Sequence, residues 1–144
     1  MADYLFVNYY WQLYDVVAQY QDIIVSFNQI EDHFDVIFFE RIRWDIEFID
    51  GSKLVVRIEM EISECKVLEK EYYYGYYDGN GNRLFSYDNA PHHEWISTVP
   101  HHTHRGQITG VDRAYPTDIR PVTLANVLTK IRNILVKGSN EIIH

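Results

Sequence analysis

Apolar residues at the start of the chain recur at spacings of three and four, which is the period of one helix face. This stripe predicts a long helix over residues 1–30. Tyr10, Trp11 and Tyr14 make the stripe wider than a helix needs to cover a sheet, so the extra rings are either half-exposed or face a second protein. The stripe consists of Leu5, Tyr9, Leu13, Val16, Val17, Tyr20, Ile24 and Phe27.

From Val36 onward the hydrophobic period changes to two, which is typical of strands with one buried and one wet face. Two alternating segments flank Asp50-Gly51-Ser52, where glycine supplies the positive φ of a hairpin turn. Two more strands are expected around the strong turn signal Asp78-Gly79-Asn80-Gly81-Asn82. Residues 36–88 therefore predict a four-stranded antiparallel meander.

Residues 89–121 have no hydrophobic period and contain all four prolines, so this His- and Pro-rich segment is expected to be irregular. A helical stripe returns over residues 122–137, with Thr123 as a predicted N-cap and Gly138 as a predicted C-cap. The order of elements predicts a single α+β domain over residues 1–144, with the helices packed on one sheet face.

The acidic composition narrows the partners. The chain has 21 acidic and 13 basic side chains and a net charge of -8, which argues against a broad nonspecific nucleic-acid surface. A basic partner is favoured electrostatically. Either an RNA site is locally positive or its substrate is small, and the first alternative is favoured because four arginines flank the irregular segment: Arg83, Arg105, Arg113 and Arg120.

Targeting and redox features point to the cytoplasm. No apolar run approaches the ~20 residues that a spanning helix requires, so no membrane partner is expected. The N-terminal residues lack the basic start and apolar stretch of a signal peptide. The single cysteine, Cys65, excludes an internal disulfide and a cysteine-based zinc finger.

The irregular segment holds five of the seven histidines within thirteen residues, and long loops are where function concentrates. One interpretation is structural: the repeated Pro-His-His at 91–93 and 100–102 forms turns whose imidazoles cap carbonyls or pack on tyrosines. Two chemical interpretations compete with it. The clustered residues are His92, His93, His101, His102 and His104.

General acid/base catalysis is the first chemical interpretation. A pair of histidines can cleave RNA without a metal, one deprotonating the 2′-hydroxyl and the other protonating the leaving 5′-oxygen. His102 and His104 are the expected pair, helped by Tyr87 and Asp88. Developing charge on phosphorus would be stabilised by a nearby arginine. The residues expected to bind substrate are Arg83, Asn89 and Arg105.

Metal binding is the second chemical interpretation. If residues 100–105 are extended, His102 and His104 project from the same side. Imidazole pairs of this kind suit Zn or Ni, with His92, His93 or Asp88 completing the set. No His-Glu-x-x-His helix accompanies them, so a cofactor-free site is the leading expectation and a metal set of His92, His102 and His104 the alternative.

The run Tyr87-Asp88-Asn89-Ala90-Pro91-His92-His93, followed by Pro100-His101-His102-Thr103-His104, resembles the motif of the TumE-like toxin family. The resemblance extends over about Phe38 to Leu135 and includes a closing helix that begins with Thr123-Leu124. In the family motif a lysine commonly stands where this chain has Thr103. The motif falls on Tyr87, Asp88, Asn89, His92, His93, His101, His102 and His104.

The resemblance implies a prokaryotic cytoplasmic toxin, neutralised by an antitoxin that is often a helix-turn-helix protein. RNA cleavage is an expectation for such a toxin, so a ribonuclease using the residues above is the leading hypothesis. The missing lysine weakens the expectation of phosphate chemistry. The alternatives are a His-ligated metal-binding protein and a noncatalytic interaction module. In that module the aromatic N-terminal helix and the tyrosine-rich strand bind a partner protein or form homo-oligomers.

Overall fold

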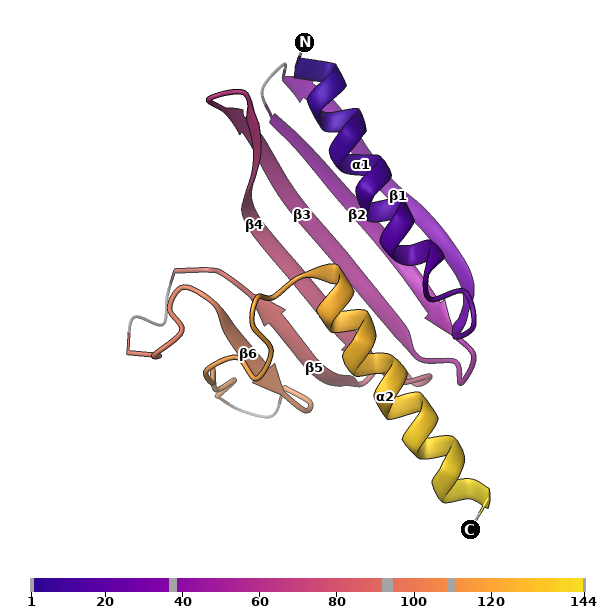
Figure 1. The fold of residues 1–144 in the computed structure, drawn as a ribbon. Helices are drawn as coiled ribbons and strands as arrows, with labels where there is room; N and C mark the ends of the chain where they lie inside the picture. Colours follow the sequence, from indigo (N-terminus) through magenta and orange to yellow (C-terminus); the bar gives the residue numbers. More distant parts are fainter. Residues whose placement is uncertain (1, 37–38, 92–94, 109–110, 144) are drawn as a thin grey trace.

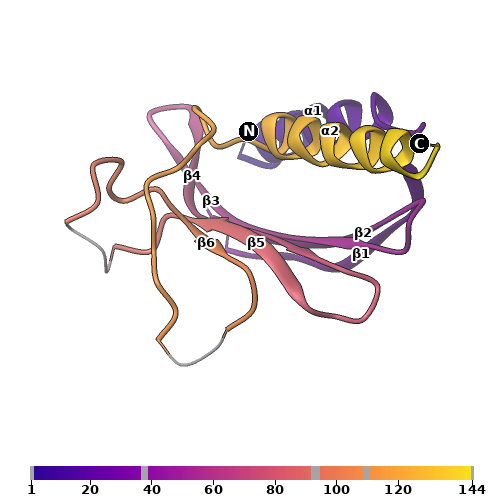
Figure 2. The same ribbon diagram turned by 90° about the horizontal axis from the view of Figure 1, so that it is seen from below.

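A computed structural model describes residues 2–36, 39–91, 95–108 and 111–143. Six antiparallel strands form one sheet in the order β1-β2-β3-β4-β5-β6, and both helices lie on the same face of it (Figures 1 and 2). The elements in chain order are α1 (Ala2–Ala18), β1 (Ile24–Val36), β2 (Phe39–Phe48), β3 (Lys53–Ser63), β4 (Lys66–Tyr77), β5 (Arg83–Asp88), β6 (His102–Arg105) and α2 (Leu124–Ile143).

The predicted N-terminal helix over residues 1–30 is wrong in its second half. Helix α1 ends at Ala18, and the chain returns as β1, which pairs with β2 through contacts such as Phe27 with Ile46. The spacing of Tyr20, Ile24 and Phe27 is that of a helix, and β1 departs from a regular period of two because its register shifts between Ile24 and Ser26. Strand pairing prevails because the β-branched residues before Phe27 fit a pleated, half-buried surface better than a helix.

The predicted four-stranded meander is also too small. Its two hairpins are confirmed, with β2 paired to β3 and β4 paired to β5, and glycines at positive φ in both turns: Gly51 at 86° and Gly81 at 84°. Strand β1 extends the sheet on one side, and β6 extends it on the other. β6 lies inside the segment expected to be irregular, and its four residues are too few to show a period.

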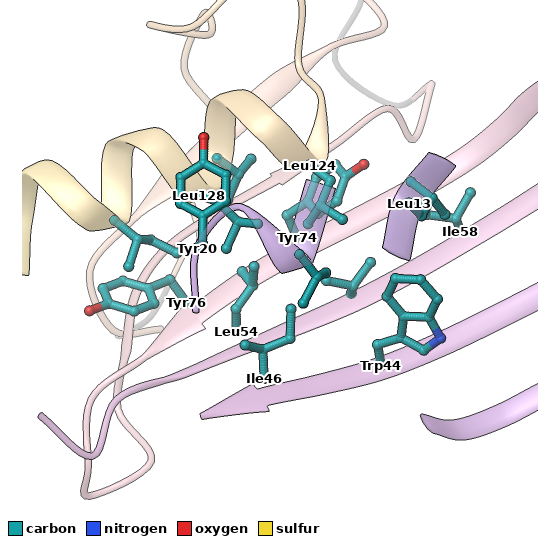
Figure 3. Packing of buried hydrophobic residues seen from close by; sticks show 14 of the residues in the cluster. Leu13, Tyr20, Trp44, Ile46, Leu54, Ile58, Tyr74, Tyr76, Leu124 and Leu128 are labelled. Carbon is teal, nitrogen blue, oxygen red and sulfur yellow. The ribbon is translucent and has the colours of Figure 1, made fainter. Parts of the chain in front are cut away.

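The core lies between the sheet and the two helices. Alternate residues of the strands point toward the helices, where Trp44, Leu54 and Tyr74 are fully buried (Figure 3). Leu13 of α1 and Leu128 of α2 cover them from above. The predicted period of two thus correctly assigns the buried face of the two hairpins.

Helix α2 begins where the sequence predicts and ends later. The Thr123 hydroxyl accepts a hydrogen bond from the Asn126 amide at 3.2 Å, which is the geometry of an N-cap. The helix continues through Gly138 to Ile143, so the predicted C-cap is wrong. Within the described residues, neither helix is long and apolar enough to cross a bilayer.

Candidate functional site at the edge of the sheet

Strands β5 and β6 place motif residues on both faces of the sheet. Residues that face each other across an antiparallel pair project to the same side, and the register pairs Asp88 with His102 and Ser86 with His104. Tyr87 lies between these positions and contacts Lys130 of α2, so it points to the helix side. Asp88, His102 and His104 therefore share the face away from the helices.

These three side chains form a compact cluster, the Asp88 trio. Nε2 of His102 lies 2.8 Å from Oδ1 of Asp88, and Nε2 of His104 lies 3.8 Å from Oδ2 of the same carboxylate. The two imidazole rings meet edge to face, with their centroids 5.0 Å apart. The trio is largely buried, since His102 is 2% and His104 12% exposed. The prediction that the two histidines project from one side is confirmed.

Backbone carbonyls determine which nitrogen of each histidine faces the carboxylate. Nδ1 of His102 lies 3.0 Å from the carbonyl of Pro100, and Nδ1 of His104 lies 2.9 Å from that of Arg113. A carbonyl only accepts hydrogen bonds, so Nδ1 carries a hydrogen in both rings. Nε2 of His102 is then the nitrogen that faces the Asp88 carboxylate, at 2.8 Å.

The same arrangement fits a metal ion. One ligand atom from each member of the trio lies within 4.8 Å of the other two. Two imidazoles and a carboxylate are a common donor set for zinc, and ligating histidines commonly donate their other nitrogen to a carbonyl. Of the predicted metal set, His102 and His104 are brought together with Asp88, whereas His92 lies outside the described residues.

Arg83 lies near the trio, but its guanidinium pairs with Asp112. Its guanidinium donates two hydrogen bonds to the Asp112 carboxylate, at 2.9 and 2.6 Å, and a third to the carbonyl of Gly106. The hydrogen bonds from Arg83 lower the pKa of Asp112. Asp112 also lies 3.4 Å from Nδ1 of His104, so Arg83 holds the chain after β6 against the trio.

Tyr87 and Arg105 are not brought to the trio. The Tyr87 hydroxyl donates to Asp118 and accepts from Lys130 at 2.7 Å, on the helix side of the sheet. Burial and the bond to Asp118 raise the pKa of Tyr87. The Arg105 guanidinium stacks over the Tyr115 ring at 4.2 Å.

Thr103 likewise points to the helix side. It pairs with Tyr87 across the strands, and its hydroxyl donates to the carbonyl of Ser86 at 2.7 Å. The position where the family motif commonly has lysine is thus on the sheet face opposite His102 and His104.

Asn89 and His101 lie at the end of the sheet, beside Tyr72 of β4. The Asn89 side chain accepts from the Tyr72 amide at 2.9 Å and donates to the carbonyl of Lys70 at 3.0 Å, so it fixes the course of the chain after β5. His101 stacks on the Tyr72 ring. His92 and His93 lie outside the described residues.

Two residues that complete these networks have no signal in the sequence. Asp112 lies in an irregular segment, and only the folded chain brings it to Arg83 and His104. Lys130 occupies a polar position of the α2 stripe, where a lysine is ordinarily solvated, yet it joins Tyr87 to Asp118.

The fold and site together define a class: an α+β protein with one helix-covered sheet face and a His-Asp cluster on the other, at the sheet edge. Within that class, the family model "Toxin TumE" matches residues 14–135, and the chain belongs to this toxin family. The match starts inside α1 and includes β1, which the resemblance in the sequence did not cover. Comparison with curated proteins and with solved structures gave no match. Family membership implies a toxin–antitoxin system, with an antitoxin as partner.

Proposed function

We propose that this toxin cleaves RNA by histidine acid/base catalysis at the Asp88 trio. The observation that carries the proposal is the single carboxylate placed between two imidazoles, with one oxygen directed to each Nε2. Paired proton-transfer groups of this type supply what phosphodiester cleavage needs at neutral pH.

The two histidines are assigned different roles by their distances to Asp88. His104, whose Nε2 is 3.8 Å from the carboxylate, takes the proton of the 2′-hydroxyl as the 2′-oxygen attacks phosphorus. The bond from phosphorus to the 5′-oxygen breaks, and that oxygen takes the proton held by His102 and Asp88, 2.8 Å apart. The products are a 2′,3′-cyclic phosphate and a 5′-hydroxyl. Asp88 stabilises the imidazolium that forms.

The test is incubation of the full chain with end-labelled RNA, with and without EDTA. We expect cleavage that survives EDTA, yields 2′,3′-cyclic phosphate ends and disappears in His104→Ala. Lys53→Ala is the control, because this exposed lysine on β3 lies away from the trio and lines neither of the cavities beside it. Its rate at saturating RNA should equal that of the wild type.

Two outcomes contradict this proposal. Cleavage that is lost in EDTA and restored by Zn²⁺ would mean that the trio binds a metal, the alternative that its donor set also fits. Intact RNA in every tube, from a chain that is toxic in cells, would mean that the target is not RNA.

A second candidate function is supported by α1. Trp11 is 62% exposed, and it lines a cavity of about 460 Å³. Phe6 and Tyr10 of the same helix and Gln29 of β1 also line this cavity. Exposed aromatic clusters of this type are enriched at protein interfaces. We propose this surface, beside the outermost strand β1, as a site for protein association.

A further inference from the structure

A cavity of about 450 Å³ opens on the helix side of the sheet, beside the first part of β4 and the C-terminal end of β5. Its volume lies within the range of about 300–1,000 Å³ that is typical of small-ligand sites. Apolar Ile119 and Val122 form part of the wall, beside polar groups. The polar and aromatic lining residues are Glu69, Tyr72, Asn89, Thr98, His101 and Arg120.

The Tyr72 and His101 rings give this cavity a flat aromatic wall. The rings are nearly parallel, at 13°, with centroids 5.7 Å apart, and the Tyr72 hydroxyl lies 2.8 Å from Nδ1 of His101. His101 is exposed, while Tyr72 is buried beneath it. A planar heteroaromatic ligand can therefore stack on this wall.

Hydrogen bonds hold the rest of the wall in place. The Thr98 hydroxyl donates to the carbonyl of His101 and accepts from the Thr117 amide at 3.2 Å. Asn89 ties the opposite side to β4. The cavity is thus formed by the folded chain itself, and a ligand does not have to order it.

A second cavity, of about 470 Å³, continues along the outer side of α2 and shares Ile119 and Arg120 with the first. Arg120, Lys130 and Lys137 line it, against one carboxylate, Asp118. Lys130 already pairs with that carboxylate at 2.9 Å. In a chain of net charge -8, this groove is a local concentration of positive charge.

We propose that single-stranded RNA binds across both cavities, with one nucleobase stacked on the exposed His101 ring and the following phosphates along Arg120 and the α2 lysines. A stacking platform beside a basic groove is the combination by which proteins hold single strands. The proposal rests on the proposed function, because it names how the substrate of the same site is held.

The position of the two cavities relative to the trio supports this route. His101 and His102 are consecutive and point to opposite faces, since His101 stacks on Tyr72 on the helix side and His102 faces Asp88 on the other side. β6 is the outermost strand. Tyr115 pairs with Thr103 along the outer edge of this strand, so RNA anchored on the helix side would reach His104 around the N-terminal end of β6.

Binding should be measured by fluorescence anisotropy in a His104→Ala background, so that no probe is cleaved. The probes are a labelled RNA of about 12 nucleotides and an abasic ribose-phosphate oligomer of the same length. We expect tighter binding of the RNA than of the abasic oligomer. His101→Ala should weaken RNA binding about tenfold without changing abasic binding, and His101→Phe should restore it.

The salt dependence of binding tests the basic groove separately. Lys137→Ala should weaken binding of both probes and reduce the slope of log affinity against log salt by about 0.7–1. Lys53→Ala is the matched control, because Lys53 is an exposed lysine on β3 and lines neither cavity.

Equal affinity for RNA and abasic oligomer would overturn the nucleobase site, and so would a His101→Ala variant that still distinguishes them. A Lys53→Ala effect as large as that of Lys137→Ala would overturn the groove. A different result would show that the proposed RNA cleavage fails while the binding site holds. If the wild type binds RNA as described but never cleaves it, the binding site stands and the catalytic assignment falls.

Discussion

Asp88 and His102 meet at 2.8 Å because β5 and β6 pair in a register that places them directly opposite each other. The contact joins the Tyr-Asp-Asn run at the end of β5 to the second Pro-His-His run, although thirteen residues separate Asp88 from His102 in the chain. Asp88 also faces His104. The carboxylate is therefore the common partner of both histidines.

Asp88→Asn tests that position directly. The amide keeps the shape of the carboxylate but cannot stabilise an imidazolium, so we expect RNA cleavage to fall by about 10²–10⁴-fold. Single-turnover cleavage measures it. Asp15→Asn, an exposed carboxylate on α1, is the control and should leave the rate unchanged. An Asp88→Asn variant with the wild-type rate would remove Asp88 from the catalytic assignment.

The pair of Arg83 and Asp112 makes stability depend on pH. Hydrogen bonds from Arg83 hold the pKa of Asp112 below its unfolded value, so the folded state binds this proton less readily. This contribution is present above the unfolded pKa of about 3.9 and is lost as the pH falls through the folded pKa.

Arg83→Ala should therefore lower the free energy of unfolding by about 1.5–3 kcal/mol at pH 7. Urea unfolding at pH 7 and near pH 3 provides the measurement, and the difference between the variant and the wild type should shrink at the lower pH. Arg113→Ala is the control, because the side chain of Arg113 is exposed. A difference that is constant with pH would contradict the pairing.

Tyr87→Phe distinguishes the two faces of the sheet. The change removes a hydroxyl that bonds Asp118 and Lys130, so we expect a loss of about 1.5 kcal/mol in unfolding free energy. The cleavage rate at saturating RNA should not change, because Tyr87 points away from the trio. A large loss of cleavage rate in a stable Tyr87→Phe variant would mean that Tyr87 takes part in catalysis, as the sequence predicts.

Trp11→Ser tests the surface on α1. Trp11 is 62% exposed, so the variant should fold normally. If the surface joins two copies of the chain, the molar mass measured by light scattering should be lower for the variant than for the wild type. Gln12→Ser, its exposed neighbour, serves as control. An unchanged mass, together with unchanged binding of the antitoxin, would contradict an interface at this place.

The sequence predicts the two central hairpins well because each has many residues with a clear period of two and a glycine turn. It misses the start of β1 because Tyr20, Ile24 and Phe27 have a helical spacing, and only pairing with β2 makes the chain from Ile24 onward a strand. Its motif correctly places His102 and His104 on one side. Asp112 and Lys130 could not be predicted, since only tertiary contacts bring them to Arg83 and Tyr87.

The alternation of side chains in β6 has a consequence for how this segment tolerates insertions and deletions. His101 and Thr103 are directed to one face, and His102 and His104 to the other, so the assignment depends on whether a residue's position is odd or even. A residue added before β6 leaves the alternation of side chains within the strand unchanged. One added between His102 and His104 would exchange the faces of the residues beyond it, separating the two imidazoles without changing any side chain.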